Sequence, residues 1–222
     1  MTVPAHSTQQ STVPPRERIL ETARALFYTR GVNNVGIDLI ILESGVAKAT
    51  LYKHFKSKNE LVVAHMRTGG TQWLEWLQKR VEHYSATPQG PQGRLIAVWE
   101  VLEEWFSQPS FRGCLLTNAV IDLSPIPEHP AWAALLEHKE KVRIYFEELA
   151  TGARIGQARA ISEGWMLLLE GATVLAAQKL TTQAATQARA IAQVLLESQG
   201  VSSPRAEPEQ PNSMLEHLDF EF

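Results

Sequence analysis

The sequence predicts an all-α protein, and three observations support this prediction. Apolar residues recur three and four positions apart along most of residues 16–196, which is the period of an amphipathic helix. Proline and glycine gather between these runs, as at residues 88–91 and in the group Pro125, Pro127 and Pro130. Convincing alternation of apolar and polar residues, the mark of a half-buried strand, is not found in the sequence.

Five apolar stripes locate the expected helices. The first follows Pro14 and Pro15, and proline suits the first turn of a helix because that turn leaves its N–H groups unbonded. The stripes are Ile19, Ala23, Leu26 and Phe27; Leu95, Val98, Leu102 and Trp105; Leu135, Val142, Phe146 and Leu149; Ile161, Trp165, Leu168 and Ala172; and Ala184, Ala188, Ile191 and Val194.

Composition indicates a globular protein of the cytoplasm. Of the 222 residues, 44% are hydrophobic and 20% charged, which is enough apolar material for a sizeable core. Cys114 is the single cysteine, so an intrachain disulfide is impossible and a reducing compartment fits. Residues 1–15 lack the basic and apolar regions of a secretory signal, and the apolar run 165–177 is too short to span a bilayer. We therefore expect no membrane partner.

Charge is distributed unevenly along the chain. Residues 16–67 contain nine Lys and Arg against five Asp and Glu, a net charge of +4, and the remainder therefore carries −7 of the total of −3. A basic segment attached to an acidic body is expected when one part of a protein meets phosphate and the other does not.

The segment between Gly31 and Leu61 has the pattern of a helix-turn-helix. A short apolar helix at residues 37–44 leads to Gly45, which tolerates the left-handed backbone of a tight turn. In the next helix Leu51 and Phe55 lie four residues apart and face inward together. The polar side chains of that helix then face outward, as a helix inserted into the DNA major groove requires.

With these residues, the chain resembles the tetracycline-repressor (TetR) family of transcriptional regulators. The resemblance covers about residues 16–66. It is carried by the first helix, by the run 48–55 and by the residues that follow this run, namely Ser57, Lys58, Glu60 and Leu61. It implies a three-helix DNA-binding domain followed by a helical ligand-binding and dimerisation bundle. The expected divisions are residues 1–15 as a disordered arm, 16–67 as the DNA-binding domain, 68–200 as the bundle and 201–222 as a flexible tail.

The resemblance also implies roles for individual residues. Leu51 and Phe55 belong to the core. Phosphate contacts are expected from some residues and contacts with base edges from others, because lysine suits guanine acceptors and alanine can touch a thymine methyl group. The residues expected to contact phosphates are Thr50, Tyr52, His54 and Lys58, and Tyr52 can also reach bases. The residues expected to contact base edges are Lys48, Ala49 and Lys53.

Four positions depart from the pattern of the family. Val35 and Gly36 stand where a Thr or Ser usually caps the second helix, and Ala47 stands where a Ser or Thr precedes the recognition helix. Ile41 replaces a customary alanine. Loss of a capping hydroxyl costs on the order of 1 kcal/mol, and it removes a group that often binds phosphate. These departures leave the fold intact but weaken the expectation of tight DNA binding.

The bundle is expected to hold an effector and to form a homodimer. All six tryptophans lie beyond residue 67, and Trp99, Trp105 and Trp165 are the candidate lining of a pocket for an apolar or aromatic small molecule. The alternative for each is a place in the core. Helices near 132–150 and 155–180 are expected to pair with their copies, so that two heads read a pseudo-palindromic operator on double-stranded DNA.

Two other classes of protein stay open as alternatives. One is an all-α dimeric ligand-binding or interaction module with lost or weak DNA binding. The other is a helical enzyme that uses Glu103 or His138, although no phosphate loop, zinc-spaced cluster or serine nucleophile motif is present in the sequence. We therefore expect no catalytic residues, no metal and no cofactor. Cys114 is interpreted as either an inert buried thiol or, beside Arg112, a redox-sensitive one.

Overall fold

The computed structural model confirms the predicted fold class. It describes residues 13–84, 90–126 and 128–199, and within them the chain forms nine α-helices and no strand. The predicted tail at 201–222 and all but residues 13–15 of the predicted arm lie outside the described residues.

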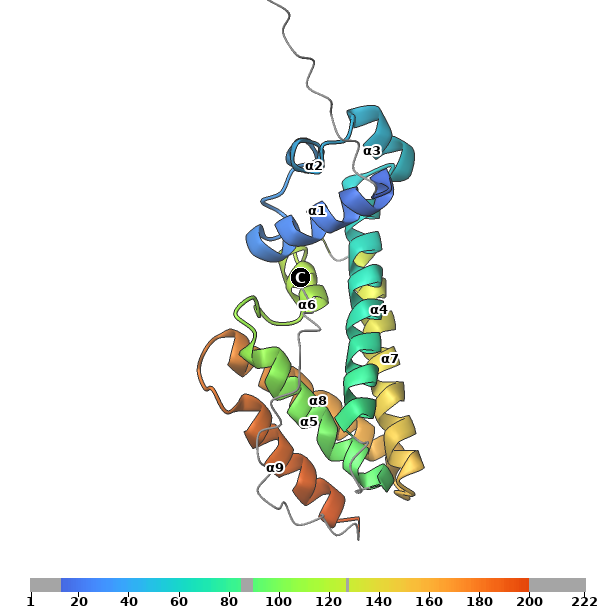
Figure 1. Cartoon of the computed structure of the whole chain (residues 1–222), viewed down its shortest axis with the longest axis vertical. Coiled ribbons are helices and arrows are strands. Elements are labelled where there is room, and N and C mark those ends of the chain that lie inside the picture. The colour runs from blue at the N-terminus through green and yellow to red at the C-terminus, as the bar shows by residue number, and fades with distance from the viewer. Residues whose placement is uncertain (1–12, 85–89, 127, 200–222) are drawn as a thin grey trace, which may run out of the picture.

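Three helices form a head at one end of the molecule (Figure 1). They are α1 (Pro15–Arg30), α2 (Ile37–Ser44) and α3 (Lys48–His54). The inner face of α1 buries Ile19, Ala23 and Phe27, which the sequence marks as one helical stripe. Leu51 of α3 is buried against this head core together with Phe55, which ends α3.

Six further helices form an elongated body below the head. They are α4 (Lys58–Tyr84), α5 (Gly90–Ser107), α6 (Leu115–Asp122), α7 (Ala131–Gly152), α8 (Ala158–Ala177) and α9 (Ala184–Glu197). Helices α4 and α7 run side by side along the length of the molecule, while α5, α8 and α9 pack at the end far from the head (Figure 1). Helix α4 continues from the head into the body across the sequence division at residue 67.

The buried apolar residues form two clusters, and α6 belongs to the upper one. The body cluster joins α4, α5, α7, α8 and α9 around Trp99 and Trp165. The head cluster includes α1 to α3 and the start of α4, but also Leu115 and Ala119 of α6 and Ala131 at the start of α7. Helix α6 is therefore packed with the head although it follows it by some fifty residues in the sequence.

Helix α8 has two apolar faces. One is buried in the body through Trp165 and Leu169, whereas Leu167 on the other face is 77% exposed. By length and composition α8 is also apolar enough to cross a membrane, with a mean hydropathy of 1.3, and it alone among the helices of the described residues meets that test. A core helix meets the same test, so one such helix is weak support for a membrane span.

Candidate DNA-binding surface and ligand pocket

The turn between α2 and α3 fixes the direction in which α3 leaves the head. Gly45 has φ 63° and ψ 27°, the left-handed geometry expected from the sequence. Val46 follows it and is 7% exposed, so it fills the angle between the two helices. With Leu51 and Phe55 buried, one side of α3 is anchored to the head.

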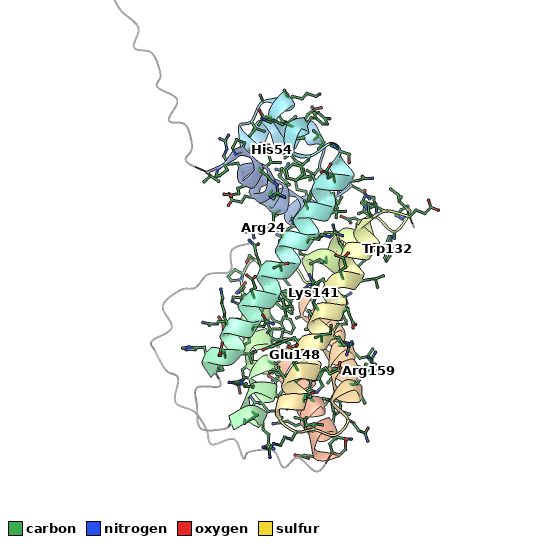
Figure 2. The ribbon with its side chains drawn as sticks, turned by 90° about the vertical axis from the view of Figure 1, so that its right-hand side faces the viewer. Arg24, His54, Trp132, Lys141, Glu148 and Arg159 are labelled. Atoms are coloured by element: carbon green, nitrogen blue, oxygen red, sulfur yellow. The ribbon has the colours of Figure 1, made fainter. Side chains whose placement is uncertain are left out.

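The opposite side of α3 lies at the surface. Lys48, Ala49, Tyr52 and Lys53 are exposed, and Tyr52 retains 42% of its accessible surface. Thr50, His54 and Lys58 are half-buried beside them. Figure 2 shows His54 in the head and Arg159 near the far end of the body, so this surface is well separated from the lower bundle. The seven residues expected to contact DNA therefore lie on or next to one helix at one end of the molecule.

One of these lysines already has an acidic neighbour. Lys48 Nζ lies 3.3 Å from Asp38 Oδ1 at the start of α2, and both side chains are largely exposed. Such an exposed pair is weak in water, so it leaves Lys48 free to exchange the carboxylate for a phosphate or a base edge.

The start of α4 is well capped, in contrast to α2 and α3. Ser57 Oγ accepts the Glu60 N–H at 3.1 Å, as an N-cap residue does, and Glu60 Oε2 accepts the Lys56 N–H at 2.8 Å, one residue before the N-cap. Partial burial lowers the pKa of Lys58 in the same turn. Gly36 and Ala47 make no side-chain cap bond, as the missing hydroxyls in the sequence predict.

A pocket opens in the body where α4, α6, α7 and α8 meet. It contains about 430 Å³ of atom-free space, part of it open to solvent. Gly69 gives it room, because a Cβ there would lie 3.3 Å from Leu115 of α6. The side chains in its wall are Trp73, Trp105, Cys114, Leu115, Leu116, His138, Lys139, Val142, Leu169, Glu170 and Thr173.

The three tryptophans chosen from the sequence do not share this pocket. Trp105 lines it, and its ring centroid lies 5.2 Å from that of Trp73. Trp99 and Trp165 are instead fully buried in the body core, 5.5 Å apart in an edge-to-face pair, and Phe146 packs on Trp165. Helical periodicity places all three inward but does not distinguish the wall of a pocket from the solid core.

Sequence reasoning did not place the polar residues of the pocket in a ligand site; it named His138 only for the enzyme alternative and Cys114 only as a thiol, and it missed Lys139. Lys139 Nζ lies 2.5 Å from Glu170 Oε1 and donates a hydrogen bond to Cys114 Sγ at 3.6 Å. Burial acts to lower the pKa of Lys139, but the neighbouring Cys114 and Glu170 outweigh it and raise that pKa. Burial lowers the pKa of His138 to about 3, so its imidazole is neutral. These residues come from α7, from α8 and from the N-cap of α6, and their separation in the sequence carries no local signal that joins them.

Hydrogen bonds connect both ends of α6 to the head. Tyr28 Oη of α1 accepts the Arg112 N–H at 2.6 Å just before α6 begins. At the other end, Asp122 Oδ2 accepts the Val32 N–H at 2.7 Å, and the Asp122 carbonyl accepts Asn33 Nδ2 at 2.5 Å. The helix that supplies Leu115 and Leu116 to the pocket is thus bonded at both ends to the segment 28–33 of the head.

The geometry defines an all-α protein with an N-terminal helix-turn-helix of the DNA-binding kind and a separate pocket in its body. Residues 19–65 match the model of the bacterial regulatory proteins of the tetR family. An HTH-type transcriptional regulator of Staphylococcus aureus (strain bovine RF122 / ET3-1) is 40% identical over 53 residues, which is 24% of this chain and 29% of that protein. The chain therefore aligns with less than a third of the length of such curated relatives.

Solved structures extend the likeness to the body. A TetR-family transcriptional regulator from Streptomyces coelicolor is 28% identical with a TM-score of 0.68, over 80% of this chain and 93% of that one. The regulatory protein TetR from Rhodobacter sphaeroides has the same fold at 20% identity, with a TM-score of 0.67 over 80% of this chain and 96% of that one. Residues 19–65 therefore carry the helix-turn-helix DNA-binding domain of the tetR family, and the chain as a whole is similar in fold to TetR-family regulators.

Proposed function

We propose that this protein is a dimeric transcriptional repressor that binds a palindromic operator and releases it when a small molecule occupies the pocket of the body. The observation that carries the proposal is the recognition helix, which is anchored by Leu51 and Phe55 and exposes Lys48, Tyr52 and Lys53. An apolar anchor behind a row of donors is the arrangement that a major-groove reader needs. Phosphate contacts from Thr50, His54 and Lys58 would set the register of the helix on the duplex, and Ala49 would lie against the bases.

Dimerisation is supported by an apolar surface on α7 and α8. The residues that form it are Leu136, Ile144, Leu167, Val174 and Leu175, which are 39–77% exposed in the single chain. Gly171 lies among them on α8, and a Cβ at this position would meet nothing within 4 Å. A second copy would bury this surface, whereas water would otherwise cover it at a cost in hydrophobic free energy. Gly164 and Ala172 instead pack within the subunit.

Helix α6 offers a route from the pocket to the DNA-binding surface. Leu115 and Leu116 line the pocket, while Asp122 and the residues just before α6 bond to the end of α1. A ligand that separates α6 from α4 would pull on α1 and with it on the helix-turn-helix. Because two recognition helices must lie roughly 34 Å apart to match successive major-groove faces, a small rotation of each head suffices to lose the operator.

The remaining assignments follow from this role. We place the protein in the cytoplasm, where its operator would be, and assign it no catalytic residue. Glu103, one of the two candidates for an enzyme, accepts a hydrogen bond from Thr186 Oγ1 at 3.3 Å on the surface. The other, His138, is held neutral in the pocket wall, where it can contact a ligand.

The test is binding to a fluorescent DNA fragment from immediately upstream of the gene, measured at several salt concentrations. Wild-type protein should bind tightly in the presence of competitor DNA, and the affinity should fall as salt rises because bound phosphates release counterions. The double variant Tyr52→Ala/Lys53→Ala should lose specific binding, while Lys79→Ala, which removes an exposed lysine of α4, should not.

Two results would contradict the proposal. If the double variant binds the upstream DNA as well as the wild type does, α3 is not the reading helix. If a selection from random DNA also yields no preferred sequence, the protein is a ligand-binding module with weak DNA affinity, as the uncapped starts of α2 and α3 would permit.

A further inference from the structure

Several hydrogen-bond donors in the wall of the pocket have no acceptor. The indole N–H groups of Trp73 and Trp105 are buried without a partner among the described residues, although their side chains are only 6% and 2% exposed. The ammonium of Lys139 has three N–H donors, of which Glu170 and Cys114 each take one. At least three donors in or beside one small pocket therefore lack an acceptor. A buried donor without an acceptor costs free energy, unless a bound molecule supplies the acceptor.

Two of the N–H groups of Lys139 are already used within the pocket. Glu170 Oε1 and Cys114 Sγ each accept one of them, which leaves the third N–H for another acceptor. His138 and Thr173 line the same space and can serve as donors or acceptors. The two charged groups cancel, because the Lys139 ammonium faces the Glu170 carboxylate at 2.5 Å. A ligand with its own charge would have to break this pair or remain unpaired in a largely apolar cavity.

The walls favour a flat ring. Trp73 and Trp105 lie 5.2 Å apart with their planes inclined at 57°, and the His138 ring meets Trp73 edge-on at 5.7 Å. Leu115, Val142 and Leu169 complete an apolar enclosure. Aromatic side chains prefer such offset and edge-to-face contacts with other rings.

We propose that the pocket binds a small, uncharged aromatic compound bearing a carbonyl or similar oxygen, which accepts hydrogen bonds from Lys139 and from the indole N–H of Trp105. This inference rests on the proposed function, since it specifies the effector of that same pocket. It also explains why a lysine lies in an aromatic cavity. Glu170 and Cys114 hold the ammonium in place, and its remaining N–H donates a hydrogen bond to the oxygen of the ligand.

The experiment compares four compounds of nearly the same shape on the full chain. Acetophenone carries a carbonyl, cumene replaces it with carbon, benzoate is an anion and 1-phenylethylammonium is a cation. Isothermal titration calorimetry or ligand-observed NMR gives the affinity of each. We expect acetophenone to bind roughly ten-fold more tightly than cumene, the gain typical of one hydrogen bond from a charged donor, and the two ions to bind more weakly than acetophenone.

Variants identify the donors. Lys139→Met should remove the preference for acetophenone over cumene, and Lys139→Arg, which keeps a charged donor, should retain most of it. Trp105→Phe keeps a ring but deletes the N–H, and should reduce the preference by roughly three-fold. Lys141→Met is the matched control, because Lys141 is exposed on the same helix (Figure 2) and should leave all four affinities unchanged. Circular dichroism establishes that each variant is folded.

Several outcomes would overturn the inference. Equal binding of cumene and acetophenone means that the pocket recognises only the apolar shape of the ligand and makes no hydrogen bond to its carbonyl. If 1-phenylethylammonium binds most tightly, Glu170 is the residue that binds the ligand's charge. If benzoate binds most tightly, the site binds anions. If none of the four binds, the site as described fails. DNA binding without any compound is measured separately, so loss of the effector site and loss of the regulator role remain distinguishable.

Discussion

The bond between Asp122 and the head gives a quantitative test of how the two parts of the chain are joined. Asp122 Oδ2 accepts the Val32 N–H at 2.7 Å, and Val32 is 1% exposed. Replacing Asp122 with alanine removes a charge-assisted hydrogen bond and leaves that N–H buried without an acceptor. Hydrogen bonds to charged groups contribute about 1.5–3 kcal/mol, and a buried orphan donor costs a similar amount. We therefore expect Asp122→Ala to lower the free energy of unfolding by about 2–3 kcal/mol.

The assay is guanidinium unfolding followed by circular dichroism at fixed protein concentration. For a chain of this length the change corresponds to a fall in Tm of roughly 5–10 °C. Asp122→Asn keeps an oxygen at the same place and should cost only about 1 kcal/mol. The control is Glu137→Ala, which breaks the bidentate contact with Arg67; both side chains there are about half exposed, so the loss should stay within about 1 kcal/mol.

The reasoning is refuted if Asp122→Ala matches the wild type within the error of the measurement, or if asparagine is as damaging as alanine. The same variant bears on the route from pocket to DNA. If α6 positions the head through Asp122, operator affinity should fall in Asp122→Ala even at temperatures where the protein is fully folded.

Three further predictions concern pH, capping and assembly. Burial lowers the pKa of both His65 and His138 to about 3, whereas the pKa of histidine in the unfolded chain is near 6.5. Between these values the unfolded chain binds more protons than the folded one, so the free energy of unfolding should fall as pH drops from 6.5 toward 3. The loss at pH 5.5 is on the order of 1 kcal/mol for each histidine, and His65→Leu should remove the contribution of His65 when denaturation is measured as a function of pH. Ala47→Ser should restore a cap to α3 and raise the free energy of unfolding by about 1 kcal/mol. If stability does not rise, the lack of a capping hydroxyl does not weaken α3. Leu167→Glu should convert a dimer into monomers in light scattering, and an unchanged mass would place the interface elsewhere.

The sequence by itself determined the features that depend on neighbours along one helix. The four-residue spacing of Leu51 and Phe55 identifies the buried side of α3, and this leaves Lys48, Tyr52 and Lys53 on the other side. Gly45 marks the turn because few residues adopt its left-handed backbone. These inferences hold because the geometry of a helix and of a tight turn is set locally.

Only the tertiary structure decided which inward residues meet. Trp99, Trp105 and Trp165 share the same helical pattern, yet one lines the pocket and two fill the core. Lys139 and Glu170 lie 31 residues apart and become partners only because α7 packs against α8. Likewise, Asp122 of α6 bonds to Val32, which follows α1 and lies ninety residues earlier. The physical reason is that periodicity fixes the face of a helix, whereas the angle and register at which helices pack decide what that face contacts.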